Sequence, residues 1–208
     1  MVKLARRAFL AAVPAVLASP AMAAPTAGER LAAAARAQTR VTRGYDPVYR
    51  RIAYPGGDVP RTTGVCCDVV IRAARDALGL DLQKLVHEDM QRDFAAYPSK
   101  RVWGLSAPDA NIDHRRVLNL EVFFARQHAK LWSADSFVLG SAFPGRLLPG
   151  DILTWRLLPG GQTHTGMVVQ GPDDMRIVHN IGGGAQEVSL ARMAFARAAM
   201  RFRWPVKA

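Results

Sequence analysis

The sequence predicts an α+β fold in which the helices come first along the chain and an antiparallel sheet follows. Half of the 208 residues are hydrophobic and 22% are charged, a composition typical of one compact globular domain with a sizeable core. In the first two thirds of the chain, apolar residues recur at the three- and four-residue spacing of amphipathic helices. After residue 149, short apolar runs are separated by glycine-containing turns, which is typical of strands joined by hairpins.

Helices are predicted over residues 28–38, 66–78, 82–97 and 117–127. Gly79 follows the second of these helices and is a typical C-terminal stop. Thr62 and Thr63 precede the same helix and can cap its first turn. Asp81 can cap the third helix, and Pro98 ends it.

Strands are predicted over residues 151–157, 164–170 and 175–180, with turns at 159–161 and 171–174. A short helix around residues 190–198 and a last strand over residues 200–204 complete the chain. Because the three strands form a meander, the start of the second and the end of the third lie at the same edge of the sheet.

Residues 1–23 have the pattern of a secretory signal peptide. Three basic residues precede an alanine-rich apolar run over residues 8–18, and Ala-Met-Ala at 21–23 is a small-x-small cleavage site. The apolar run is too short to cross a bilayer. Arg6 and Arg7 also fit a twin-arginine signal, and ordinary Sec-type charge is the alternative.

We therefore expect a periplasmic or secreted protein with no integral membrane segment after cleavage. Residues 24–44 are expected to form a helix and linker, and residues 45–208 the functional domain. Loss of the three basic signal residues lowers the net charge from +11 to +8. A basic exported chain is attracted to anionic polymers, so the expected partner is cell-wall peptide or another anionic envelope polymer. The arginines are scattered and form no block, which disfavours nucleic-acid binding.

The two cysteines, Cys66 and Cys67, are adjacent in the chain. A bridge between neighbours is strained and there is no third cysteine, so a disulfide framework is excluded. Cys66 falls where a turn-rich loop runs into a predicted helix, and the helix dipole with its unpaired N–H groups favours a thiolate there. A catalytic role therefore explains the free thiol at Cys66 better than a structural disulfide does. Cys67 is typical of a small buried residue.

A thiol nucleophile needs a base within hydrogen-bond reach and a polar group that orients the base. His164 opens the second predicted strand and His179 ends the third, so both histidines lie at one edge of the sheet. There they can face the start of the helix that carries Cys66. The orienting group is then either His179 or the next residue, Asn180.

The run Asp113-His114-Arg115-Arg116 has two interpretations. It is either a solvated loop tied by ion pairs, or a site where Arg115 or Arg116 recognises a substrate carboxylate. A metal site could combine Asp113 and His114 with His87 and His164, but this set lacks the usual ligand spacing, so no metal or other cofactor is expected.

Several short segments resemble the NlpC-type papain-like cysteine hydrolase superfamily. They are Gly-Val-Cys at 64–66, Pro-Gly-Asp-Ile-Leu-Thr-Trp at 149–155 and His-Thr-Gly-Met-Val-Val at 164–169. Further segments resemble a bacterial family of unknown function, number 1287, within that superfamily. They are His-Glu-Asp-Met at 87–90, Asn-Ile-Asp-His-Arg-Arg at 111–116 and Val-His-Asn-Ile-Gly at 178–182. The resemblance covers about residues 45–204. That family has threonine at position 67, which points to Cys66 as the reactive thiol.

The resemblance implies a papain-like fold, with N-terminal helices packed on a C-terminal antiparallel sheet. It also implies hydrolysis of an amide bond in cell-wall peptides, with Cys66 as nucleophile, His164 as base and His179 as orienting group. Tyr54, in a Tyr-Pro-Gly-Gly segment, and the backbone N–H of Cys66 would stabilise the oxyanion. Acyl transfer or lipid-ester hydrolysis on the same fold, or a non-catalytic envelope-binding module, are the alternatives.

Overall fold

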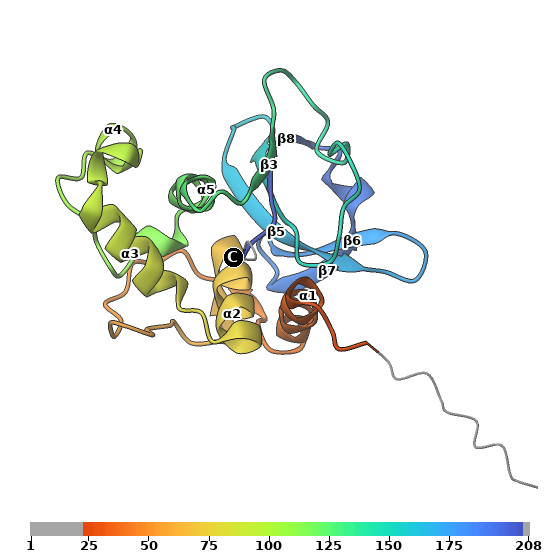
Figure 1. Ribbon diagram of the computed structural model, residues 1–208, viewed down its shortest axis with the longest axis horizontal. Coiled ribbons are helices and arrows are strands. Elements are labelled where there is room, and N and C mark those ends of the chain that lie inside the picture. Colours follow the sequence, from red (N-terminus) through yellow and green to blue (C-terminus); the bar gives the residue numbers. More distant parts are fainter. Residues whose placement is uncertain (1–22, 206–208) are drawn as a thin grey trace, which may run out of the picture.

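The structure is a computed structural model that describes residues 23–205 (Figure 1). All but the last residue of the predicted signal peptide lies outside this range. The α-helices are α1 (Ala27–Ala37), α2 (Cys66–Leu78), α3 (Leu82–Arg92), α4 (Ser99–Trp103) and α5 (Val117–Arg126). The strands are β1 (Gly44–Tyr45), β2 (Thr63–Gly64), β3 (Lys130–Ser133), β4 (Ile152–Leu157), β5 (Thr163–Gln170), β6 (Met175–Asn180), β7 (Ala185–Ser189) and β8 (Ala196–Phe202). Short 3-10 helices are η1 (Gln38–Arg40), η2 (Phe94–Ala96), η3 (Asp113–Arg115) and η4 (Leu190–Met193).

Six strands form one antiparallel sheet in the order β3-β8-β4-β5-β6-β7, and β1 and β2 form a separate parallel pair. The pairs β4–β5 and β5–β6 are the hairpins that the sequence predicts. Helices α1 and α2 pack on each other and on β5, and α3 and α4 lie on the side of α2 away from the sheet (Figure 1). The predicted α+β architecture is confirmed. Within residues 23–205, no helix has the length and apolar character needed to cross a bilayer.

Helix α2 has the bounds that its apolar spacing predicts, from Cys66 to Leu78. Gly79 follows in the left-handed conformation (φ 67°), which glycine adopts without strain. The predicted threonine caps are wrong, because Val65 occupies the N-cap position and its N–H donates to the Asp68 carboxylate at 2.6 Å. The start of α2 is therefore capped from within its own first turn.

Two predicted helices are shorter in the structure. Helix α3 ends at Arg92, because Asp93 leaves the helical conformation and its side chain caps η2. The helix predicted over residues 190–198 is limited to η4, and β8 begins at Ala196. The alanine-rich sequence of β8 favours a helix, but β8 pairs with β4 on one side and β3 on the other, and this pairing overrides the local preference.

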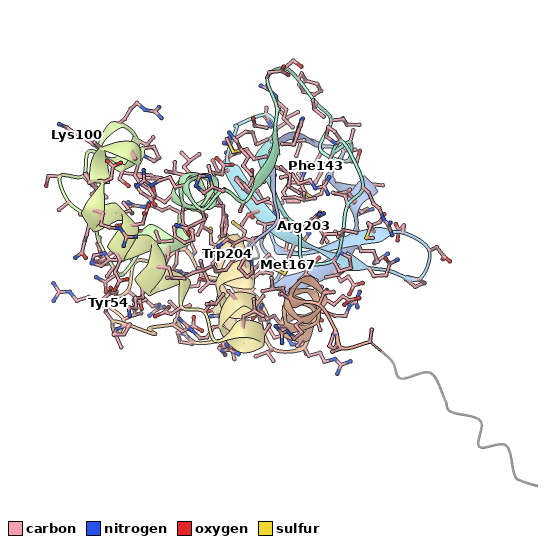
Figure 2. The ribbon with its side chains drawn as sticks, viewed as in Figure 1. Tyr54, Lys100, Phe143, Met167, Arg203 and Trp204 are labelled. Carbon is pink, nitrogen blue, oxygen red and sulfur yellow. The ribbon has the colours of Figure 1, made fainter. Side chains whose placement is uncertain are left out.

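The sheet is covered on both faces. Met167 belongs to the core between the helices and the sheet, whereas Phe143 belongs to a second core on the opposite face. Figure 2 shows Met167 beside α2 and Phe143 within the loop that precedes β4. Leu153 and Trp155 of β4 fill this second core. The loop over residues 134–151 thus replaces a helical layer on that face.

Phe124 of α5 lies at the centre of an aromatic cluster that joins the helices to the end of the sheet. Its ring centroid lies 5.5 Å from that of Phe202 and 5.6 Å from that of Trp204, and its side chain is 1% exposed. Aromatic side chains contribute a large buried area and favourable ring geometry. This contact therefore holds α5, which borders the site described below, in place.

We predict that Phe124→Ala lowers the free energy of unfolding by about 3–5 kcal/mol, because it removes a ring from a packed core. Phe195→Ala is the matched control, since Phe195 is 48% exposed and a surface substitution of this kind changes stability by about 0.5 kcal/mol or less. Urea unfolding at neutral pH measures both. Equal losses in the two variants would contradict the packing described here.

Candidate active site

Cys66 is the first residue of α2, and the segments in front of it are held by backbone pairing. Strand β1 pairs in parallel with β2, with Tyr45 opposite Gly64. The Asn180 amide donates to the carbonyl oxygens of Gly44 at 3.1 Å and Gly64 at 2.9 Å. A Cβ on Gly64 would lie 2.9 Å from a carboxylate oxygen of Asp68, so a larger residue there would displace the side chain that caps α2. These contacts set the direction in which the chain enters α2.

A buried ion pair ties the first turn of α2 to η3. The Arg115 guanidinium donates to both carboxylate oxygens of Asp68, at 3.0 and 2.9 Å, and to the carbonyl oxygen of Asp46 at 3.2 Å. Both side chains are buried. Arg115, one of the two arginines predicted to recognise a substrate, is therefore engaged in an internal bidentate pair.

His164 and His179 contact each other across β5 and β6. The Nε2 atom of His164 lies 2.9 Å from Nδ1 of His179, and both rings are buried. Burial and the neighbouring His164 lower the pKa of His179 to about 3, so His179 is neutral at neutral pH. In the tautomer that carries its proton on Nε2, a neutral His179 accepts a hydrogen bond at Nδ1 from the Nε2–H of His164. In that arrangement Nε2 of His164 is used by His179, and Nδ1 is the ring nitrogen that can exchange a proton with a reacting group.

The two thiols have opposite electrostatic environments. Hydrogen bonding with Cys67, together with hydrogen bonding and charge from His164, lowers the pKa of Cys66 well below its ordinary value. Burial, together with the hydrogen bond to Cys66, raises the pKa of Cys67 well above its ordinary value. Cys66 is therefore the thiol that ionises more readily, with Cys67 as a hydrogen-bond donor beside it.

A cleft of about 210 Å³ opens at Cys66. Its lining includes Tyr45 and Trp103, together with Arg116 and Thr163. Burial, with a further contribution from the charge of Cys66, raises the pKa of Tyr45 to about 12. Tyr45 therefore keeps its phenolic proton and can donate a hydrogen bond into the cleft.

The structure places Tyr54, the tyrosine predicted for the oxyanion, away from this cleft. Tyr54 is 44% exposed, and its ring packs edge-on against His87 of α3 with the centroids 5.1 Å apart. Figure 2 shows Tyr54 at the outer edge of the helical side. Tyr45 lies in the cleft instead. No periodic pattern in the sequence points to Tyr45, because its strand β1 has two residues and pairs in parallel with β2.

Asp113 and His114 are internal residues that do not line the cleft. Asp113 accepts the backbone N–H of Asp109, and burial raises its pKa to about 6. His114 is buried with no hydrogen-bond partner on Nδ1 among the described residues, and burial lowers its pKa to about 4. Both residues therefore hold η3 in place and are not positioned to contact a ligand in the cleft.

Arg115 and Arg116 both line the cleft, and Arg116 is the one that is not held in the bidentate pair with Asp68. Its guanidinium lies 4.2 Å from the centroid of the Trp103 ring, and its side chain is 19% exposed. Asp113 is its one ion-pair partner among the described residues, at 3.4 Å. Arg116 thus retains donor groups for an anion in the cleft. Within residues 23–205, no cluster of three or more His, Cys, Asp or Glu side chains is arranged to hold a metal ion.

Residues 32–204 match the family described as "Domain of unknown function (DUF1287)". The chain belongs to the DUF1287 family. It is similar to "Uncharacterized protein YijF" of Escherichia coli (strain K12), with 49% identity over 160 residues that cover 76% of this chain and 73% of that relative. Among solved structures, NlpC1 from Trichomonas vaginalis aligns with a TM-score of 0.44 and 16% identity, covering 86% of this chain. The aligned part spans only 45% of that structure.

We predict that iodoacetamide labels Cys66 of this DUF1287 protein at a rate that stays near its plateau between pH 7 and pH 8.5. Reaction of an ordinary thiol with a pKa near 8.5 slows by about tenfold for each pH unit below that value. In His164→Ala, the pH midpoint of labelling is expected to rise, because the neighbouring charge is lost. Mass spectrometry with peptide fragmentation assigns the labelled sulfur.

The control is Cys66→Ala, in which Cys67 is the remaining thiol. Because Cys67 is buried with a raised pKa, labelling of this variant is expected only after unfolding. A wild-type midpoint near pH 8.5, or fast labelling of folded Cys66→Ala, would contradict the assignment of the thiolate to Cys66.

Proposed function

We propose that this protein is an exported cysteine hydrolase that cleaves an amide bond in cell-wall peptides. The observation that carries the proposal is that His164 neighbours the Cys66 thiol at the start of α2 and contacts His179 at 2.9 Å. There the pKa of Cys66 is lowered and that of Cys67 is raised. A nucleophile, a base and an orienting group in that order form the arrangement that covalent acyl transfer requires.

In the first half of the reaction, the Cys66 thiolate attacks the carbonyl carbon and the carbonyl π electrons move to oxygen. The oxyanion receives hydrogen bonds from the Cys66 backbone N–H at the positive end of α2 and from the Tyr45 hydroxyl. As the tetrahedral intermediate collapses, the C–N bond breaks and His164 gives its Nδ1 proton to the leaving amine. A thioester on Cys66 remains.

In the second half, neutral His164 takes a proton from water while the water oxygen attacks the thioester carbonyl. Collapse breaks the C–S bond, releases the carboxylic acid and restores the thiolate beside a protonated His164. His179 stays neutral throughout and accepts the Nε2–H of His164, which keeps the ring oriented. It is therefore a positioning residue.

The substrate class is supported by charge and by the cleft. The expected mature chain is basic. Arg116 lines the same cleft as Cys66, and its guanidinium packs over the ring of Trp103. Guanidinium groups bind carboxylates in a bidentate manner, so a peptide with a carboxylate next to the cleaved amide fits this arrangement. The export signal in the sequence supports an encounter with such peptides in the envelope.

We expect the mature protein to release peptide fragments from purified peptidoglycan, and Cys66→Ala to reduce the rate at least about a thousandfold, because the nucleophile is lost. Mass analysis identifies the new termini. Release by Cys66→Ala at the wild-type rate, or no release by wild type, would overturn the proposal. Products that carry an added amine would indicate acyl transfer in place of hydrolysis.

A pair of tyrosine variants tests the oxyanion assignment. We expect Tyr45→Phe to lower kcat about a hundredfold, since the loss of one oxyanion donor typically costs that much. Tyr54→Phe should stay within about twofold of wild type, because Tyr54 lies outside the cleft. The same fragment-release assay measures both. A large loss in Tyr54→Phe with none in Tyr45→Phe would show that the tyrosines are wrongly assigned.

A further inference from the structure

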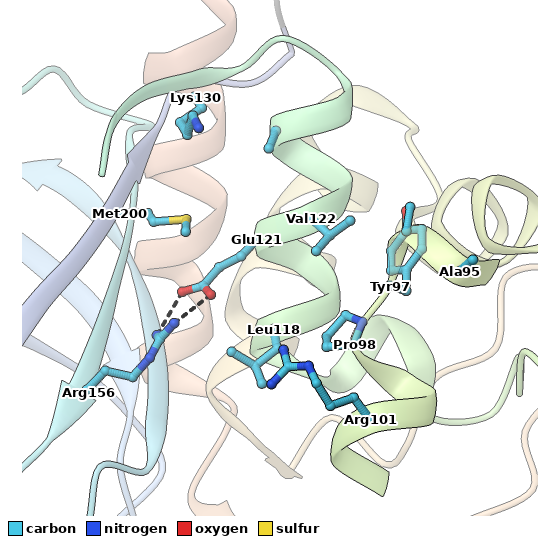
Figure 3. Close-up of a pocket in the computed structure, with 12 residues that line it drawn as sticks. Ala95, Tyr97, Pro98, Arg101, Leu118, Glu121, Val122, Lys130, Arg156 and Met200 are labelled. Carbon is cyan, nitrogen blue, oxygen red and sulfur yellow. Dashed lines mark hydrogen bonds and ion pairs between the residues drawn. The ribbon is translucent and has the colours of Figure 1, made fainter. Parts of the chain in front are cut away.

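A second cavity, of about 430 Å³, is lined by residues of α4, α5 and β4 (Figure 3). Helix α4 contributes Arg101 to this cavity and Trp103 to the cleft. Strand β4 contributes Arg156 to the cavity, and its cross-strand partner Thr163 on β5 lines the cleft. Because α4 and the β4–β5 pair border both the Cys66 cleft and the second cavity, a peptide bound at Cys66 can extend into the second cavity.

The second cavity carries an excess of positive charge. Arg156 donates through both terminal nitrogens to the buried Glu121 carboxylate, at 2.8 and 2.7 Å, so these two charges neutralise each other. Arg101 and Lys130 are exposed and make no ion pair with any described residue. Figure 3 shows Arg101 reaching from α4 across Leu118 toward Arg156. Two cations are thus available to a ligand.

The remaining wall is largely apolar. It includes Leu118 and Val122 of α5 and Met200 of β8. A ligand that matches this wall has aliphatic carbon beside its anionic groups. Arg101 and Lys130 come from separate elements, α4 and β3, so they suit anionic groups that are set apart on a ligand. Separate carboxylates on a peptide therefore match the cavity.

We propose that this cavity binds an acidic peptide segment of the substrate, on the side of the cleaved bond that extends past Thr163 and Trp103. Its carboxylates pair with Arg101 and Lys130, and its aliphatic carbons pack on α5. The inference rests on the proposed function in one respect, since the hydrolase activity makes the peptide a substrate. Binding itself needs no catalysis.

The test measures binding in Cys66→Ala, which cannot turn substrate over. The probe is the peptide acetyl-Ala-Glu-Leu-Glu-Ala-amide, and the matched probe replaces both glutamates by glutamine. Isothermal titration calorimetry at low salt is expected to show at least about tenfold weaker binding for the glutamine peptide. It is also expected to show at least about tenfold weaker binding of the glutamate peptide when Arg101→Gln and Lys130→Gln are added.

Arg30→Gln with Arg40→Gln is the control, because it removes two exposed positive charges that line neither hollow. It should leave the dissociation constant within about twofold. Equal binding of the two peptides, or equal losses in the two double variants, would overturn the site and indicate a general charge effect.

The two proposals can fail separately. If wild type releases no fragments but the charge-dependent binding is seen, the hydrolase is wrong and the binding site stands. If fragments are released and the Arg101→Gln/Lys130→Gln variant changes neither KM nor peptide binding, the binding site is wrong. The pH midpoint of Cys66 alkylation should be unchanged in that variant, which separates loss of binding from damage to the nucleophile.

Discussion

The buried pair between Asp68 and Arg115 is the interaction on which the site depends. Asp68 caps the start of α2 through the Val65 N–H and binds Arg115 with both oxygens. Arg115 in turn holds the Asp46 carbonyl, so it fixes the chain next to Tyr45. Removing two charges from water is costly, and here the cost is offset because the pair is bidentate, Asp68 also accepts the Val65 N–H and Arg115 also donates to the Asp46 carbonyl oxygen. One ion pair thereby sets the positions of the thiol, the tyrosine and η3.

Near this pair, residues of the same type have different electrostatic environments and therefore different roles. Adjacent cysteines have pKa values shifted in opposite directions, since Cys66 meets His164 at the helix start while Cys67 is fully buried. In the histidine pair, burial keeps His179 neutral, so its Nδ1 can accept a hydrogen bond from His164. Pairs of titratable groups with divergent environments are typical of sites that carry out acid–base chemistry.

Much of this arrangement could be predicted from the sequence, because it depends on local periodicity. The bounds of α2 follow from apolar spacing and Gly79, and the shared edge of His164 and His179 follows from a meander of consecutive strands. Tyr45 could not be found, since its two-residue strand is defined only by pairing with a distant segment. The alanine-rich sequence predicts a helix over the first part of β8, and only its pairing with β3 and β4 makes this segment a strand.

His179 and Asn180 end the same strand, and successive side chains of a strand point to opposite faces. His179 contacts His164, while Asn180 holds the carbonyls of Gly44 and Gly64 in front of α2. A slip of β6 by one residue would exchange the two side chains and break both contacts together. The last two residues of β6 therefore make assembly of the site all-or-none, so a misregistered chain has neither an oriented base nor an anchored nucleophile.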